Sequence, residues 1–291
     1  MILKFEPLAF KKVWGGDKLG KVYSIDKDKI GEIWGISAHK SASNKIINTE
    51  FKGLTLRELY NSNKALFGNY KSEEFPVLFK VIDAKKDLSI QVHPENEYAR
   101  EKENSLGKAE CWYILEADET TEIIIGHKAK NEEELRCLVK NENYDQLLNK
   151  FKINIGDYFY IPAGKVHAIC KDTTLLEISQ SSDITYRLYD YNRLDNGKLR
   201  DLHIEDSLAV IKAPDSPLET KHVKEYFDFK ILSNNGTSEK SADKFGDYIY
   251  VISGSGTFDF EKVKQGDFLM VNSESRYLVE GNLTYALVNI I

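Results

Sequence analysis

Residues 156–167 have the sequence Gly156-Asp-Tyr-Phe-Tyr-Ile-Pro-Ala-Gly-Lys-Val-His167. A Gly-Asp turn leads into a short aromatic and β-branched run, and a Pro-x-Gly turn then starts the next strand. This order predicts two strands joined by a tight turn, with the imidazole of His167 directed inward. A buried histidine that hydrogen-bonds only to the backbone is the alternative. The specific order of Gly-Asp turn, strand, Pro-x-Gly turn and histidine favours a ligand position for His167.

Short runs of the same kind recur along the chain. Apolar, β-branched and aromatic runs bounded by Gly, Pro, Asn and Asp are typical of antiparallel strands. We expect strands at Pro76–Ile82, Leu88–Val92, Cys111–Glu116, Glu122–Ile125, Asp157–Ile161 and Thr174–Ser179. The sequence therefore predicts a mainly β protein.

Two stretches have helical periodicity instead. Residues 54–67 begin with Thr55, a candidate N-cap, and end before Gly68. Residues 131–150 open with an asparagine and three glutamates, which suit the positive end of a helix. Two further asparagines, at 141 and 143, are expected to divide this stretch into two short helices.

The segment Ala213-Pro-Asp-Ser-Pro217 has the composition of a linker, and strand-like runs resume after it. We therefore expect two units, residues 1–212 and 218–291, with helical insertions near 54–67 and 131–150 in the first. Each unit is predicted to be a small β-barrel or sandwich.

Part of the Gly156–His167 motif is repeated in the second unit. Gly266-Asp267 precedes the strand-like run Phe268–Val271, as Gly156-Asp157 precedes its own run. This similarity indicates a weak internal duplication. Counted from Gly266, however, the positions of the motif's Pro, second Gly and His hold Asn272, Glu274 and Tyr277. These residues cannot build a metal site, so we expect the second unit to have a supporting or interface role.

Composition excludes several classes of protein. The 291 residues are 42% hydrophobic and 30% charged, which is ordinary for a soluble globular protein. A net charge of −6 lacks the basic excess of a general nucleic-acid binder. The longest apolar runs, such as Ile123–Ile125, have strand length, and charges near the N-terminus interrupt any signal peptide. With only three scattered cysteines, we expect a cytoplasmic protein with no membrane or nucleic-acid partner.

Potential metal ligands occur at three places. In Gln91-Val-His93-Pro94, the residues two apart point to the same face of a strand, although such a pair alone is more typical of hydrogen-bonded polar residues. Glu110 stands at the entry to an apolar strand, where a solvated carboxylate is the ordinary interpretation. Together with His167 they offer two imidazoles, one carboxylate and one amide oxygen, a set that suits Zn²⁺ with one position left for water or substrate.

The remaining histidines lack a comparable context and are expected to be surface or core polar residues. They are His39, His127, His203 and His222.

The motif itself resembles a known signature. Gly156, Pro162, Gly164 and His167 match G-x5-P-x-G-x2-H, the second half of the cupin signature. The wider sequence is similar to the type I phosphomannose isomerases, in their short bacterial form. The strings that carry this resemblance, in the expected order, are Val13–Leu19, Gly31–Ser37, Gln91–Pro94, Lys108–Tyr113 and Ser182–Asp190.

The resemblance implies two cupin-like jelly-roll barrels, the second degenerate, and the interconversion of mannose 6-phosphate and fructose 6-phosphate. It implies one zinc ion per chain, bound by His93, Glu110 and His167, with Gln91 where longer relatives have a fourth ligand. It also implies Arg187 as the active-site arginine, with Lys108 and Glu177 lining the pocket. The chain is expected to be a monomer or a homodimer.

The sequence departs from the longer relatives in two places. Asn96 stands where they have a lysine three residues after the metal-binding histidine, and Leu106-Gly107-Lys108 replaces an Asn-His-Lys string. Of the phosphate contacts carried by those relatives, only Lys108 matches.

Aldose–ketose exchange moves a proton between C1 and C2 and develops negative charge on an enediolate, which a metal stabilises as a Lewis acid. Arg187 suits stabilising that charge or holding phosphate, and Lys108 could do either. Glu177 is a candidate proton shuttle. A salt-bridge partner of a pocket cation is the alternative role for Glu177.

Two rival functions share these features. Two histidines and one carboxylate also form the facial triad of non-haem iron oxygenases, which have this fold. Gln91 as an extra ligand, with Lys108 and Arg187 nearby, suits an anionic sugar better. A non-catalytic sugar-binding or regulatory cupin is expected to lose Arg187 or a ligand, and here both are present.

Overall fold

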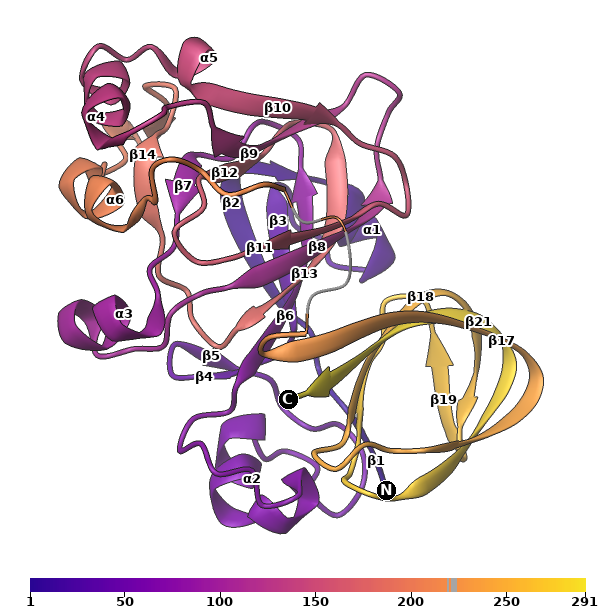
Figure 1. Cartoon of the computed structure of the whole chain (residues 1–291). Coiled ribbons are helices and arrows are strands. Elements are labelled where there is room, and N and C mark those ends of the chain that lie inside the picture. Colours follow the sequence, from indigo (N-terminus) through magenta and orange to yellow (C-terminus); the bar gives the residue numbers. More distant parts are fainter. Residues whose placement is uncertain (219, 221–223) are drawn as a thin grey trace.

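The computed structural model describes residues 1–218, 220 and 224–291, so that His222 lies outside the described residues (Figure 1). Within residues 1–212, a pair of antiparallel sheets face each other. The first has the strand order β10 (Leu148–Lys152), β9 (Glu122–His127), β12 (His167–Ile169), β7 (Ile90–Val92) and β14 (Tyr186–Tyr189). The second has the order β11 (Tyr158–Ile161), β8 (Glu110–Glu116), β13 (Thr173–Gln180), β6 (Val77–Ala84), β2 (Leu8–Gly16) and β3 (Ile30–Ile36).

The six predicted strands are all confirmed, with ends that differ by at most two residues. Alternation along each strand decides what fills the space between the sheets. Trp112 and Ile114 of β8 point inward and meet Ile123 and Ile125 of β9 in one apolar cluster. The chain is therefore mainly β, as predicted.

A third sheet covers the outer face of the second. Its strands are β1 (Ile2–Lys4), β20 (Phe268–Val271), β18 (Asp247–Phe258), β21 (Arg276–Ile290) and β17 (Phe227–Ser241), with β19 (Glu261–Lys264) on β18. The N-terminal strand β1 thus pairs with β20, and Leu3 lies opposite Met270. Phe79 and Tyr160 share one core with Phe229 and Phe268 across the contact. Within the described ranges the strand order of each sheet is open, and no sheet closes into a hydrogen-bonded barrel.

The two predicted helical stretches are present. Residues 54–67 form α2 (Leu56–Ser62) and a 3-10 helix (Lys64–Phe67), and α2 begins with a capping box in which the Thr55 hydroxyl accepts from the Glu58 amide. Residues 131–150 form α4 (Glu132–Lys140) and α5 (Tyr144–Leu147), separated at the two asparagines. The prediction was wrong for residues 148–150, which begin β10. Pairing with the edge of β9 outweighs local helical propensity there.

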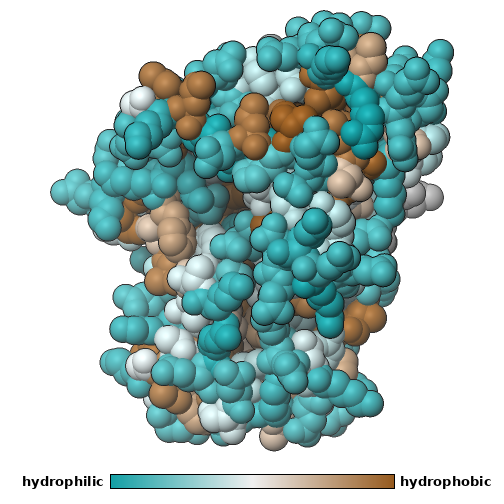
Figure 2. Space-filling view, turned by 90° about the vertical axis from the view of Figure 1, so that its left-hand side faces the viewer, coloured by the Kyte–Doolittle hydropathy of each residue, from teal (hydrophilic) through white to brown (hydrophobic). Residues whose placement is uncertain are grey.

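Three helices and two hairpins were not predicted: α1 (Lys18–Val22), α3 (Asn96–Glu103), α6 (Ile204–Val210), β4 (Ala38–His39) with β5 (Ala42–Ser43), and β15 (Leu194–Asp195) with β16 (Lys198–Leu199). Helix α3 buries only Ala99 and so carries no apolar stripe to detect. Helices α4, α5 and α6 pack on the outer face of the first sheet. Figure 2 shows this side of the molecule, where apolar side chains gather in the upper half among hydrophilic ones. No described helix combines the length and the apolarity needed to cross a bilayer.

The two copies of the Gly-Asp turn have the same local geometry. Gly156 and Gly266 both have φ of 91°, a left-handed conformation that favours glycine. In each turn the aspartate accepts a hydrogen bond from the amide three residues earlier, at 2.7 Å from Asn154 to Asp157 and at 2.9 Å from Lys264 to Asp267. This agreement supports the internal duplication.

In the second copy a tyrosine replaces the histidine. The hydroxyl of Tyr277 donates to the buried carboxylate of Asp247 at 2.7 Å. We expect Tyr277→Phe to lower the free energy of unfolding by about 1–3 kcal/mol, because it leaves a buried acceptor without this donor. Urea denaturation measures the loss. Tyr285→Phe is the matched control, since no described residue hydrogen-bonds that buried hydroxyl. Equal losses in both variants would contradict the prediction.

Candidate metal centre

Three buried side chains converge between the two facing sheets. His93 directly follows β7, Glu110 opens β8 and His167 opens β12. Each side chain is at most 1% exposed. The Nε2 atoms of His93 and His167 are 3.2 Å apart, and each lies 3.5 Å from a Glu110 carboxylate oxygen. Among the residues that the structure describes, this is the one group of three His, Cys, Asp or Glu side chains close enough to share a metal ion.

The hydrogen bonds of His167 select its tautomer. Its Nδ1 lies 2.8 Å from the carbonyl oxygen of Lys165, so that nitrogen carries the proton and the Nε2 lone pair faces the cluster. The ammonium of Lys165 is in turn held by Asp215, at 2.7 Å, and by the Ser216 carbonyl. The predicted linker therefore supports the motif by binding its lysine.

The protonation states suit metal binding. Burial lowers the pKa of His167 to about 4, and burial followed by the charge of Lys108 lowers the pKa of His93 well below its usual value. Both imidazoles are neutral near pH 7, as ligation requires. Two neutral nitrogens with lone pairs facing each other at 3.2 Å favour a cation nearby, so the donor set fits a metal ion.

Gln91 completes the candidate ligand set. Its amide nitrogen lies 3.4 Å from His167 Nε2, and a half-turn of the amide would present the oxygen to the same point. The sheet register explains this position. His167, Gln91 and Arg187 are direct neighbours across β12, β7 and β14, and cross-strand partners point to the same face. These three residues form a row that we call the ligand row.

Arg187 therefore lies on the inner face, two strands from His167. Its Nη1 donates to the Asp201 carbonyl at 2.7 Å, and burial lowers its pKa. The backbone amide of Arg187 donates to Nδ1 of His203 at 3.2 Å. His203, expected from the sequence to be a surface or core polar residue, thus helps to hold the strand that carries Arg187.

A second row faces the first from the other sheet. Trp112, Glu177 and Lys80 are direct neighbours across β8, β13 and β6. Glu177 Oε1 lies 3.1 Å from Lys108 Nζ and 3.4 Å from Lys80 Nζ. Lys108 also contacts His93 Nε2 at 3.2 Å and forms an ion pair with Glu110. The structure thus places Lys108 and Glu177 beside the cluster.

The pKa values of Glu110 and Glu177 are shifted in opposite directions. Burial, together with the charge of Glu177, raises the pKa of Glu110 to about 7. Burial alone would also raise the pKa of Glu177, but Lys108 and Lys80 outweigh it and lower that pKa to about 2. An ionised Glu177 between two ammonium groups matches the salt-bridge role that the sequence left open.

Lys80 is the site residue that sequence reasoning missed. It is 7% exposed, and the attraction of Glu177 and Glu32 outweighs burial and raises its pKa. The available signal was a single lysine inside the apolar run of β6, because an unpaired charge is rarely buried. His39 and His127 are buried and have partners outside the cluster, since His39 lies 3.5 Å from Asp183 and His127 contacts the Lys212 carbonyl at 3.0 Å.

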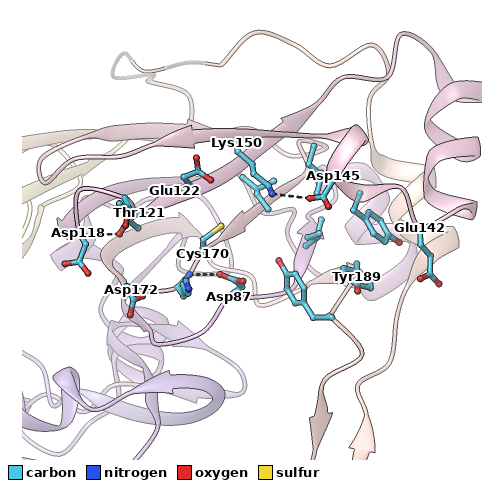
Figure 3. A pocket seen from close by; sticks show the side chains of 17 residues that line it. Asp87, Asp118, Thr121, Glu122, Glu142, Asp145, Lys150, Cys170, Asp172 and Tyr189 are labelled. Carbon is cyan, nitrogen blue, oxygen red and sulfur yellow. Dashed lines mark hydrogen bonds and ion pairs between the residues drawn. The ribbon is translucent and has the colours of Figure 1, made fainter.

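The opposite face of the first sheet carries an acidic pocket of about 450 Å³ (Figure 3). Ile90 and Ile124 form part of it, and they point away from the ligand row because they alternate with Gln91 and Ile125. Six carboxylates line the pocket, from Asp87, Asp118, Glu122, Glu142, Asp145 and Asp172, against two lysines, Lys150 and Lys171. This pocket is electrostatically unsuited to an anion.

The sequence is similar to known proteins of one family. Residues 2–128 match the family described as phosphomannose isomerase type I, catalytic domain. Mannose-6-phosphate isomerase of Streptococcus mutans is 50% identical over 69% of this chain, and that alignment spans 65% of the relative. A putative mannose-6-phosphate isomerase of Bacillus subtilis is 37% identical over 98% of this chain and 97% of the relative.

Solved structures show the same fold. The crystal structure of mannose 6-phosphate isomerase from Bacillus subtilis superimposes with a TM-score of 0.93, at 36% identity over 99% of both chains. A putative mannosephosphate isomerase from Archaeoglobus fulgidus shares the fold at a TM-score of 0.85 and 22% identity. Since the similarity to the Bacillus proteins extends over nearly the whole length of both partners, the chain belongs to the type I phosphomannose isomerase family of enzymes.

Proposed function

We propose that this chain interconverts mannose 6-phosphate and fructose 6-phosphate through an enediol, with one zinc ion per chain. The observation that carries the proposal is the buried cluster of His93, Glu110 and His167, with Gln91 beside it, in a chain related to proteins named mannose-6-phosphate isomerases. Two imidazoles and one carboxylate with an open position match a catalytic zinc site. When bound, the metal would supply Lewis-acid polarisation of the sugar oxygens.

The surrounding residues have separate roles in this proposal. Arg187 offers a fixed fork of donors from the ligand row and stabilises the charge that develops on the enediolate. Lys108 places an ammonium beside the same oxygens. Glu177 remains the candidate for moving the proton between C1 and C2, and its two ion pairs also position Lys108 and Lys80.

We also propose that the chain contains two cupin-like units. The two facing sheets correspond to one cupin-like jelly roll within residues 1–212, and the sheet of residues 218–291 to a degenerate second one. The repeated Gly-Asp turn supports this assignment. Strand β1 then belongs to the second unit in space, although it opens the first in sequence. We propose a cytoplasmic monomer or homodimer.

The purified chain is expected to convert mannose 6-phosphate to fructose 6-phosphate in a coupled assay. A chelator should abolish this turnover and added zinc should restore it, because the ligand atoms have no metal-independent role in polarising the sugar. Elemental analysis should find one zinc per chain.

Two metals per chain, or full turnover without any metal, would contradict the proposal. Bound iron with oxygen consumption and no isomerisation would favour the iron oxygenase, which shares the two-histidine, one-carboxylate set.

A further inference from the structure

Residues 210–216 run from the end of α6 through most of the linker and lie against the turn that precedes β12. We call these residues the clasp. The amide of Lys212 donates to the Gly164 carbonyl at 3.3 Å. Gly164 has φ of 83°, and a Cβ atom at this position would lie 2.8 Å from the Val210 carbonyl oxygen. The motif glycine therefore serves both the turn and the close approach of the clasp.

A buried ion pair joins the clasp to the same turn. Lys165 Nζ lies 2.7 Å from Asp215 Oδ1 and also donates to the Ser216 carbonyl at 2.7 Å. The charged side chains of Lys165 and Asp215 are 2% and 11% exposed. The other carboxylate oxygen of Asp215 accepts from the His127 backbone amide at 3.3 Å. Removal of one partner from such a pair leaves a buried charge without compensation, which is strongly destabilising.

The turn under the clasp contacts both candidate imidazole ligands. The Gly164 amide donates to the His93 carbonyl at 2.8 Å. The Lys165 carbonyl lies 2.8 Å from Nδ1 of His167 and accepts its proton. Two consecutive residues of one turn thus fix the backbone of His93 and the ring of His167. A hydrogen bond of this kind sets the direction of the opposite ring nitrogen, so a displaced turn would misdirect Nε2 of His167.

This arrangement differs from an ion pair that only stabilises the fold. Asp190 is also buried and pairs with two arginines, but neither of them contacts a histidine of the cluster. For Asp215, the paired ammonium and the carbonyl that holds His167 belong to the same residue, Lys165. A change at Asp215 therefore reaches the metal centre through a single residue.

We propose that Asp215 is a positioning residue of the metal centre, which raises the affinity for zinc by holding Lys165 and so directing the ring of His167. This inference rests on the proposed function, because it takes the cluster to be a zinc site. Contact of the clasp with the turn and binding of zinc then favour each other, since such coupling is reciprocal.

The test is Asp215→Asn, which keeps the size of the side chain and removes its charge. The zinc Kd, measured on the folded protein by competition with a chromophoric chelator, should rise about 10- to 100-fold, as is usual when a partner that orients a metal ligand is lost. The absorption bands of the cobalt-substituted protein should shift as well, because the direction of His167 Nε2 changes.

Two further variants separate positioning from stability. Asp190→Asn is the matched control, because it neutralises another buried carboxylate with cationic partners. It should lower the melting temperature and leave the zinc Kd and the cobalt spectrum unchanged. The double variant Lys165→Gln, Asp215→Asn should recover most of the lost zinc affinity, because two amides can hydrogen-bond and no buried charge remains unpaired.

Amide hydrogen exchange tests the same coupling in the wild-type protein, where no variant has to fold. Zinc should slow exchange of the Lys212 amide, which donates to Gly164 in the turn. It should have little effect on the Arg193 amide, which donates to the Asp190 carbonyl at 3.1 Å in a turn away from the clasp.

An unchanged zinc Kd in folded Asp215→Asn, or an equal rise in Asp190→Asn, would overturn the proposal. Exchange of the Lys212 amide that does not respond to zinc would also overturn it. Failure of the proposed function is distinguishable. Wild-type protein that binds no zinc would overturn the metal site itself, whereas wild-type protein that binds zinc but does not isomerise mannose 6-phosphate would overturn only the activity.

Discussion

Replacement of His167 by alanine is expected to release the metal, abolish isomerase activity and lower the melting temperature. In the proposed metal site His167 is one of three candidate ligands, with His93 and Glu110, and the Nδ1 contact to the Lys165 carbonyl directs its Nε2 toward the cluster. No other described histidine lies near enough to replace it. A metal that binds only the folded chain stabilises it by mass action, by about 2.7 kcal/mol at a hundredfold excess over Kd. The variant should lose this increment.

The measurements are zinc stoichiometry, activity, and the melting temperature with and without added zinc. His127→Ala is the matched control, because His127 is buried at the end of β9 in the same sheet but contacts the Lys212 carbonyl and not the cluster. The control should lose some stability through packing and still gain melting temperature when zinc is added. Full zinc occupancy and normal turnover in His167→Ala would remove His167 from the metal centre.

Replacement of Arg187 by alanine is expected to leave zinc content and fold intact and to lower kcat/KM about a hundredfold or more. A guanidinium is not a metal ligand, and Arg187 is separated from His167 by the strand of Gln91. Loss of one donor to a developing oxyanion in a closed site typically costs about 3 kcal/mol. Arg187→Lys should restore little, because an ammonium cannot reproduce the planar fork.

Steady-state kinetics show at which step Arg187 acts. Arg187→Ala should lower mainly kcat, because the lost interaction forms as charge develops in the transition state. Arg136→Ala is a suitable control, because that arginine is half exposed and its one ion pair among the described residues, with Glu205, is long, at 4.0 Å, and lies at the surface. Near-normal turnover would exclude Arg187 from the mechanism, and zinc loss would show it to be structural.

Much of the fold could be predicted because its signals are local. Each predicted strand is a run whose composition and bounding turns lie within a few residues, and the Thr55 cap defined the start of α2 in the same way. The helix end near Leu148 was predicted wrongly because its position depends on pairing with β9. Helix α3 was not predicted because it buries almost no apolar face.

The residue types at the candidate metal centre could be predicted, because the Gly156–His167 motif and the Gln91–Pro94 run specify turns and strand faces locally. Which side chains become neighbours depends on how distant strands pair. The ligand row joins residues 76 and 96 positions apart, and Lys80 becomes a site residue only when β6 pairs with β13. Strand register and charge proximity arise from contacts between distant segments, which periodicity and spacing along one chain do not encode.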